Sequence, residues 1–233
     1  MDKKTIAFLV YPDVTPLDLI GPLQVLKPLE RFGPYQVVTV GERREPMATD
    51  VGLMLQPERT FAEVERPFAL VVPGGLIGPI KAVVNDALMA YVRSVAQTAE
   101  VMASVCTGSI ILAAAGLLEG RRATTHWSFL EPLGRLGARP VRERWVEDGN
   151  VITAAGVSAG IDMALALVAR LAGEDIARTI QTIIEYDPQP PLGGIDWRWV
   201  EQSGLDRALL PPVLPEIQRI LAARPELAAK MFP

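Results

Sequence analysis

The stretch VMASVCTGSIILAAAGLL, residues 101–118, predicts a buried strand that runs directly into a helix. Its first five residues, Val101–Val105, form the mostly apolar run expected of a strand that is covered on both faces of a parallel sheet. From Thr107 to Leu118 the sequence is rich in alanine and leucine, which favours a helix that ends at the Gly120 turn. The stretch therefore places Cys106 on the turn between a strand and a helix.

The same alternation of strands and helices extends along most of the chain. Further strands are predicted at Thr5–Tyr11, Tyr35–Val40, Phe68–Val72 and Arg122–Thr125, with a hairpin-like pair at Val141–Glu147 and Val151–Ala154. Helices are predicted at Leu17–Phe32, Asn85–Ala99, His126–Leu136, Ile161–Leu171, Asp175–Tyr186 and Glu216–Arg224, while 47–61 holds short strands or a loop. This order predicts an α/β fold, with a mostly parallel sheet and helices on both faces.

Composition excludes several classes of protein. Half of the 233 residues are apolar (49%), so the chain can bury a large core. The net charge of −4 disfavours nucleic-acid binding, and one cysteine and one histidine exclude a disulfide framework and multi-histidine zinc sites. No apolar stretch approaches the roughly 18 residues that span a bilayer. We expect a cytoplasmic protein without a membrane segment, metal or cofactor, whose N-terminus forms a strand and not a signal peptide.

The composition changes near the C-terminal end. Residues 187–194, DPQPPLGG, are rich in proline and glycine. We therefore expect one α/β domain over 1–191 and a tail over 192–233 that packs on this domain or on a second copy. Trp197 and Trp199 in the tail suit such packing better than stacking on bases.

Cys106 is the leading candidate for a catalytic residue. A helix N-terminus carries unpaired N–H groups and partial positive charge, so the thiol pKa is expected to fall there. The same N–H groups could hold an oxyanion. The alternative is a buried structural cysteine, which is the usual role of a lone cysteine.

Three other strand ends carry candidate residues. Gly74 and Gly75 follow Pro73 and could expose their N–H groups to a ligand, or form an ordinary turn. Asp18 lies between leucines just past the first strand; it is either a helix-start acid or a buried carboxyl group with a raised pKa that moves protons. His126 could pair with Cys106, although a merely hydrogen-bonded histidine is commoner.

Residues 156–160, GVSAG, match the G-x-S-x-G elbow of serine hydrolases. The α/β-hydrolase order requires a histidine after the serine, and His126 precedes it. We therefore interpret Ser158 as part of a glycine-lined helix start beside the site.

These segments together resemble the ThiJ/PfpI superfamily and, within it, the isocyanide hydratases. The matching stretches are 17–22, 72–75, 104–109, 115–118, 123–127, 159–162 and 185–191. The resemblance implies a flavodoxin-like sandwich, a homodimer and a carbon–nitrogen-acting hydro-lyase that needs no cofactor. It implies Cys106 as the nucleophile, Asp18 as the acidic residue beside it and Thr107 as a further site residue. Around them, Gly74, Gly75, Gly21, Val157 and Ser158 are expected to bind the isocyanide substrate or an oxyanion.

Two departures and several alternatives stand beside this resemblance. Residues 76–79 and 192–197 differ from the hydratase pattern, which affects the expected pocket and the packing of the tail. Thr107 stands where protease-like members have a histidine, which counts against peptidase activity. Other candidates are a glyoxalase-like or amidase enzyme of this fold and a cysteine-based redox sensor. An AraC-type regulator would need a basic helix-turn-helix region, which this acidic chain is too short to hold.

Overall fold

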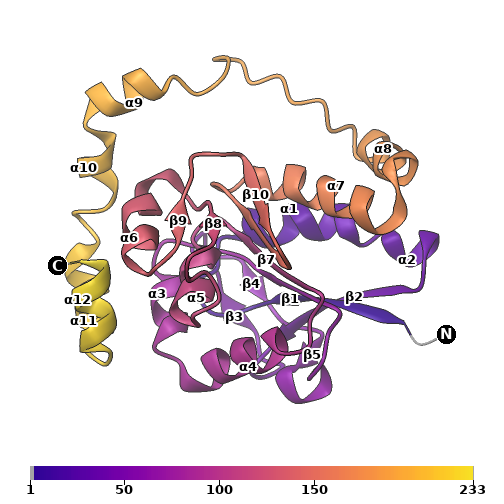
Figure 1. Ribbon diagram of the computed structural model, residues 1–233, viewed down its shortest axis with the longest axis horizontal. Coiled ribbons are helices and arrows are strands. Elements are labelled where there is room, and N and C mark those ends of the chain that lie inside the picture. Colours follow the sequence, from indigo (N-terminus) through magenta and orange to yellow (C-terminus); the bar gives the residue numbers. More distant parts are fainter. Residues whose placement is uncertain (1–2, 233) are drawn as a thin grey trace.

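A computed structural model describes residues 3–232, and its centre is a seven-stranded sheet between two layers of helices (Figure 1). The strand order is β10-β11-β7-β6-β1-β2-β5. These strands are β1 (Lys4–Leu9), β2 (Tyr35–Gly41), β5 (Arg59–Thr60), β6 (Ala69–Val72), β7 (Val101–Val105), β10 (Trp145–Asp148) and β11 (Val151–Ala154). Neighbouring strands run parallel except β10 and β11, which form an antiparallel hairpin. The predicted α/β fold with a mostly parallel sheet is confirmed.

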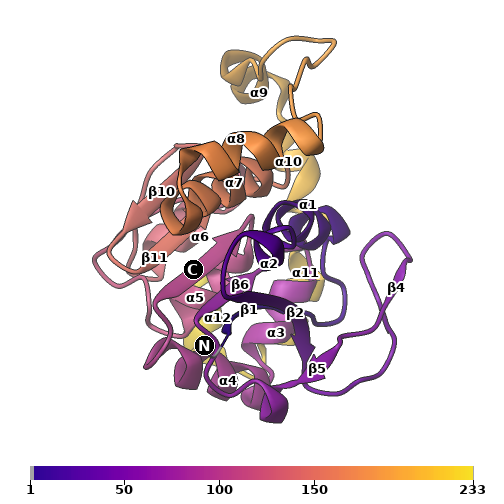
Figure 2. The same ribbon diagram turned by 90° about the vertical axis from the view of Figure 1, so that its right-hand side faces the viewer.

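Helices cover both faces of this sheet. One face carries α1 (Pro16–Leu26), α2 (Leu29–Phe32), α7 (Ala159–Ala172) and α8 (Glu174–Ile183). The other carries α3 (Gly78–Val83), α4 (Asp86–Ala96), α5 (Gly108–Ala114), α6 (Leu130–Arg135), α11 (Leu214–Leu221) and α12 (Pro225–Met231). Figure 2 shows α1, α7 and α8 above the strands and α3 and α4 below them.

Short elements connect these layers. They are the strand pair β3 (Met47–Ala48) and β4 (Met54–Leu55), the pair β8 (Arg122–Ala123) and β9 (Arg139–Pro140), the 3₁₀ turns Phe61–Glu63 and Trp127–Phe129, and the helices α9 (Trp197–Ser203) and α10 (Leu205–Leu209).

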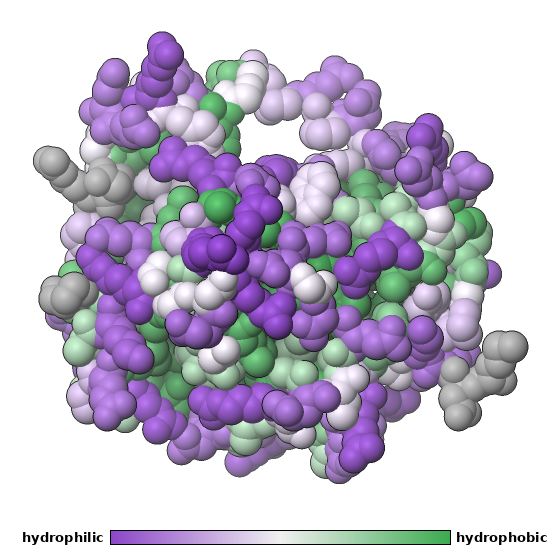
Figure 3. Space-filling model, viewed as in Figure 1, coloured by the Kyte–Doolittle hydropathy of each residue, from purple (hydrophilic) through white to green (hydrophobic). Residues whose placement is uncertain are grey.

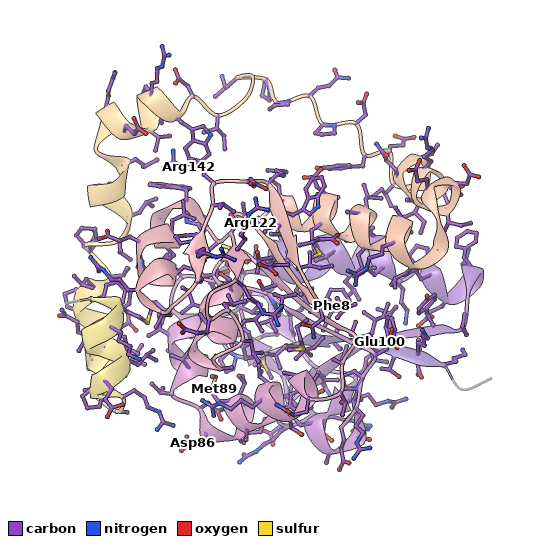
Figure 4. The ribbon with its side chains drawn as sticks, viewed as in Figure 1. Phe8, Asp86, Met89, Glu100, Arg122 and Arg142 are labelled. Carbon is purple, nitrogen blue, oxygen red and sulfur yellow. The ribbon has the colours of Figure 1, made fainter. Side chains whose placement is uncertain are left out.

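The alternation of side chains along β1 explains the two cores. Successive side chains in a strand point to opposite faces. Ile6 and Phe8 join the core under α1 and α7, whereas Ala7 and Leu9 join the core under α3, α4 and α5. Figure 4 labels Phe8 in this central strand, and its side chain is fully buried. The carboxyl ends of β1, β6 and β7 therefore meet between two packed layers.

Several predicted boundaries were wrong. The helix predicted over 107–118 ends at Ala114, and Gly116 just beyond it has a φ of 83°. The helix predicted over 17–32 is two helices, since Pro28 has no N–H to continue the first and instead caps the second. The segment after His126 begins as a 3₁₀ turn before α6. The strand predicted from Val141 begins at Trp145, because the Val141 N–H donates to the Ala123 carbonyl of β8 at 2.9 Å and so continues the pairing of residues 139–140.

The tail packs on the body at its end and stands away from it at its start. Ile217, Leu221 and Met231 are fully buried in the core beneath α11 and α12. By contrast, residues 187–196 form an exposed connection from α8 to α9, with Leu192 97% exposed. Figure 3 shows an opening beneath this connection.

The start of α9 makes the contact between the tail and the loop before β10. Trp197 packs edge-on against Trp127, with 6.5 Å between the ring centroids. The guanidinium of Arg142, labelled in Figure 4, lies 4.9 Å from the centroid of the Trp197 ring. Trp199 is 59% exposed.

Replacing Gly108 by alanine is expected to destabilise the fold strongly. A Cβ atom at Gly108 would lie 2.1 Å from the carbonyl oxygen of Val72 and 2.8 Å from that of Pro73. Both are backbone atoms of the neighbouring β6 strand and its turn, so neither can move cheaply, and we expect a loss of about 3 kcal/mol. For a chain of this size that lowers the thermal midpoint by roughly 6 to 12 °C, measurable by circular dichroism. Gly194→Ala is the control, because a Cβ there meets open space; equal midpoints for the two variants would contradict the prediction.

Candidate active site

Cys106 lies on a strained turn between β7 and α5. Its φ angle is 57°, in the left-handed region that residues other than glycine rarely adopt. Its N–H donates to the carbonyl oxygens of Ala154 and Ala155 at 3.1 and 3.0 Å. Its carbonyl oxygen accepts from the hydroxyl groups of Ser109 and Thr125, both at 3.1 Å. Hydrogen bonds on both sides of the residue therefore hold the elbow in a conformation that it would not adopt alone.

The sulfur of Cys106 faces hydrogen-bond donors and one carboxyl group. The donors are the backbone N–H groups of Val157 and Thr107, and the hydroxyl oxygen of Thr107 lies 4.0 Å from Sγ. The carboxyl group belongs to Asp18, whose negative charge acts on the thiol. Cys106 is only 5% exposed, so little bulk water reaches this group of atoms.

Asp18 is a fully buried acid. Its Oδ2 accepts from the Gly74 N–H at 3.0 Å, and its Oδ1 has no hydrogen-bond partner. Burial raises the pKa of this carboxyl from 3.8 to about 7, although the hydrogen bond from Gly74 and the neighbouring Cys106 thiol act in the opposite direction. Of the two alternatives for Asp18, this environment favours the buried carboxyl group with a raised pKa, which can both take up and release a proton near neutral pH.

The expected fall of the thiol pKa is wrong for the free site. Burial raises the pKa of Cys106, and the negative charge of Asp18 raises it further. The donors on Val157 and Thr107 lower the pKa and offset only part of this effect. The position of Cys106 at a helix start was inferred correctly, but burial and the nearby acid outweigh the helix. The Cys106 thiol of the free protein therefore keeps its proton at neutral pH.

Gly74 and Gly75 do not offer free N–H groups to a ligand, contrary to expectation. The Gly74 N–H is taken by Asp18, and the Gly75 N–H donates to the hydroxyl oxygen of Thr107 at 3.0 Å. Thr107 in turn donates to the Gly75 carbonyl. Glycine is required at position 74, because a Cβ there would lie 2.6 Å from the Thr107 nitrogen and 2.8 Å from Asp18 Oδ2. The two glycines thus position the acid and the threonine.

The structure brings only one of the other three expected pocket residues to the sulfur. Val157 supplies an N–H group to it. Gly21 is buried where a Cβ would lie 3.1 Å from Ile161, so it permits close packing of α1 on α7. Ser158 is exposed and accepts from Arg144 Nη2 at 3.2 Å. The interpretation of Ser158 as part of a helix start therefore fits its position better than the nucleophile alternative.

His126 does not form a pair with Cys106. Its Nδ1 lies 2.7 Å from the hydroxyl oxygen of Ser128, and no hydrogen bond of the described residues joins its ring to Cys106. Burial lowers the pKa of His126, so the ring is neutral at pH 7. The ring packs against Gly156, whose notional Cβ would lie 2.9 Å from His126 Cδ2.

Tyr11 was missed as a site residue, since its aromatic ring fits the apolar run of the first strand. Its hydroxyl donates to the carbonyl oxygen of Pro73 at 2.5 Å. Burial raises the pKa of Tyr11, and the charges of Asp18 and Cys106 raise it further. A tyrosine at the carboxyl end of a strand in a parallel sheet is a signal that could have indicated it.

Among the described residues, no group of three histidine, cysteine or acidic side chains could hold a metal ion. Across 3–232, no helix is long and apolar enough to cross a membrane.

Comparison with known proteins gives one family and a similar enzyme. Residues 4–170 match the DJ-1/PfpI family. The chain is 44% identical over 187 residues to the isonitrile hydratase of Pseudomonas putida, covering 80% of each chain. A ThiJ/PfpI family protein from Pseudomonas syringae superposes with a TM-score of 0.84 at 34% identity, covering 96% of this chain and 91% of that one. The transcriptional regulator CdhR of Pseudomonas aeruginosa is 33% identical over 136 residues, which cover only 39% of the regulator.

Proposed function

Because this chain belongs to the DJ-1/PfpI family, we propose that it hydrates isocyanides to N-formamides with Cys106 as the nucleophile. The observation that carries this proposal is the buried pair of Cys106 and Asp18, a soft nucleophile and an acid whose pKa is about 7 and whose charge acts on the thiol. The 44% identity to a protein named isonitrile hydratase supports the same substrate class.

The first half of the proposed reaction forms a bond to sulfur. The Cys106 sulfur attacks the terminal carbon of R–N≡C as the thiol proton leaves. The proton passes through Asp18 to the same carbon, which gives a covalent thioimidate, Cys–S–CH=N–R. Asp18 suits this transfer because its pKa is about 7 and because its buried Oδ1 has no hydrogen-bond partner.

The second half adds water and releases the thiol. Water adds to the thioimidate carbon while a proton moves to nitrogen, and cleavage of the C–S bond then gives R–NH–CHO. The backbone N–H groups of Val157 and Thr107 stabilise the negative charge that builds on sulfur as it leaves. In this proposal the two N–H groups, which only partly stabilise the thiolate of the free protein, act as the carbon–sulfur bond forms and breaks.

An assay of purified protein with an aryl isocyanide tests this function directly. N-formamide should form catalytically, with many turnovers per thiol, as followed by liquid chromatography. Absence of turnover with a thiol shown to be reduced would reject the proposal, and methylglyoxal consumption would then test the glyoxalase-like alternative. Sulfinate at Cys106, found by mass spectrometry together with no turnover of any candidate substrate, would instead favour the redox-sensor alternative.

We also propose a homodimer in a reducing compartment, the cytoplasm. Large apolar side chains near the site are exposed in the single chain, among them Leu17 and Ile20 of α1 at 47% and 41%. Such residues favour contact with a second copy. Light scattering at micromolar concentration should give twice the 25.3 kDa chain mass, and a monomer would reject this part of the proposal.

A further inference from the structure

The peptide group between Pro73 and Gly74 is held at both of its polar ends. Its carbonyl oxygen accepts from the Tyr11 phenol at 2.5 Å, and its N–H donates to Asp18 Oδ2 at 3.0 Å. The three groups form one chain, from phenol through amide to carboxyl. A donor on the carbonyl polarises the amide and strengthens the N–H as a donor in its turn.

The orientation of the Pro73–Gly74 peptide depends on hydrogen bonds from outside the loop. Gly74 can adopt backbone conformations closed to other residues, so rotation of the peptide would meet little steric resistance on that side. A rotated peptide would remove the N–H from Asp18 and bring a carbonyl oxygen toward the carboxyl group. The next polar group along, the Gly74 carbonyl, accepts from the Thr15 N–H at 2.9 Å, which fixes the loop beyond the peptide but not the Pro73 carbonyl itself.

Tyr11 acts from the opposite side of the sheet. It belongs to the core under α3, α4 and α5, whereas Cys106 belongs to the core under α1 and α7. The titratable groups that act on Asp18 from neighbouring elements are Cys106 on its turn and Asp50 in the β3–β4 loop. Tyr11 thus reaches Asp18 through the peptide.

We propose that Tyr11 is a positioning residue, whose phenol orients the Pro73–Gly74 peptide so that the Gly74 N–H holds Asp18 against the Cys106 thiol. The effect on turnover rests on the proposed hydratase function. The effect on Asp18 and the thiol does not, because it follows from the hydrogen bonds of the free protein.

The test compares Tyr11→Phe with Tyr91→Phe. Tyr91 of α4 is a matched control, since its hydroxyl also donates to a backbone carbonyl, that of Val64 at 2.8 Å. Its ring stacks on Phe61. Cys106 is the only cysteine of the chain, so the rate of alkylation by iodoacetamide reports on this thiol alone. The charged form of Asp18 can take the proton from the thiol, so the alkylation rate should rise with pH as Asp18 loses its own proton. We expect Tyr11→Phe to raise the midpoint of this rise by about 0.5 to 1 pH unit, because the variant supports the charged form of Asp18 less well. Tyr91→Phe should leave the midpoint unchanged.

Turnover gives an independent measurement. With an aryl isocyanide, Tyr11→Phe should lower kcat about tenfold and leave KM within about twofold, since Tyr11 orients the acid and does not touch substrate. If the wild type has no isocyanide turnover, the hydratase function fails, and the alkylation profiles still decide the role of Tyr11.

Two further variants separate positioning from a general loss of structure. In an Asp18→Asn background, Tyr11→Phe should add no further shift to the alkylation midpoint, because no carboxylate remains to be supported. Incorporation of 3-fluorotyrosine at position 11 keeps the hydroxyl and makes it a stronger donor, so the alkylation midpoint should move down. This measurement tests the proposal even if Tyr11→Phe does not fold. A wild-type midpoint in both Tyr11 variants, or an equal shift in Tyr91→Phe, would overturn the proposal.

Discussion

Replacing Cys106 by alanine is expected to lower kcat for isocyanide hydration by at least about 1,000-fold, because no other group can form the thioimidate. The fold should be kept, since alanine at φ 57° is no more strained there than cysteine and the hydrogen bonds of the elbow use only backbone atoms of residue 106. Circular dichroism and the N-formamide assay on the same preparation would check both parts.

Cys106→Ser sharpens this experiment. It keeps the size of the side chain and the hydrogen-bonding partners but supplies an oxygen that is a far weaker nucleophile at neutral pH. We expect it to be as inactive as the alanine variant. If Cys106→Ala retained turnover and Ser158→Ala lost it, the G-x-S-x-G alternative would replace the cysteine mechanism.

The parts of the fold that follow from local pattern were predictable. Apolar runs indicated β1, β6 and β7, and the change of pattern after Val105 placed Cys106 on a strand-to-helix turn, which the structure confirms with a positive φ. Asn85 was predicted to cap a helix, and its side chain accepts from the Leu88 N–H at 3.0 Å. These features depend on residues that are close together in the sequence.

Features of the site that depend on distant residues could not be predicted. The thiol pKa depends on how deeply Cys106 is buried and on an acid 88 positions earlier, which no local motif reports. The partners of the Gly74 and Gly75 N–H groups are Asp18 and Thr107, from two other strand ends. Tyr11 is 62 residues from the carbonyl that it binds. Only the meeting of strand ends in the sheet brings these groups together.

Asp18→Asn is expected to lower kcat by about 100-fold and at the same time to stabilise the protein at pH 8. Asparagine can still accept from the Gly74 N–H, but it cannot take up and release the proton that the proposed reaction moves. Stability should rise because burial makes the charged form of Asp18 unfavourable in the folded protein.

The direction of the pH dependence follows from the raised pKa. Since the pKa of Asp18 is about 7 when folded and 3.8 when free, the folded state binds the proton more tightly than the unfolded state. The wild type should therefore be most stable below about pH 4 with respect to this group, and should lose that stability as the pH rises to about 7. At 1.36 kcal/mol per pKa unit the loss reaches at most about 4 kcal/mol.

Calorimetry of the wild type and Asp18→Asn at pH 4 and pH 8 would test this expectation. At pH 8 the variant should unfold roughly 5 to 10 °C above the wild type, and at pH 4 the difference should nearly vanish. Asp50→Asn is the control, because it removes an exposed acid that acts on Asp18 from outside the pocket, and its effect should stay within about 0.5 kcal/mol. If Asp18→Asn were as stable as the wild type at both pH values, burial would not destabilise the charged form of Asp18. A gain at pH 8 joined to a loss of turnover would show that the fold keeps a destabilising acid at the one position where the thiol can use its proton.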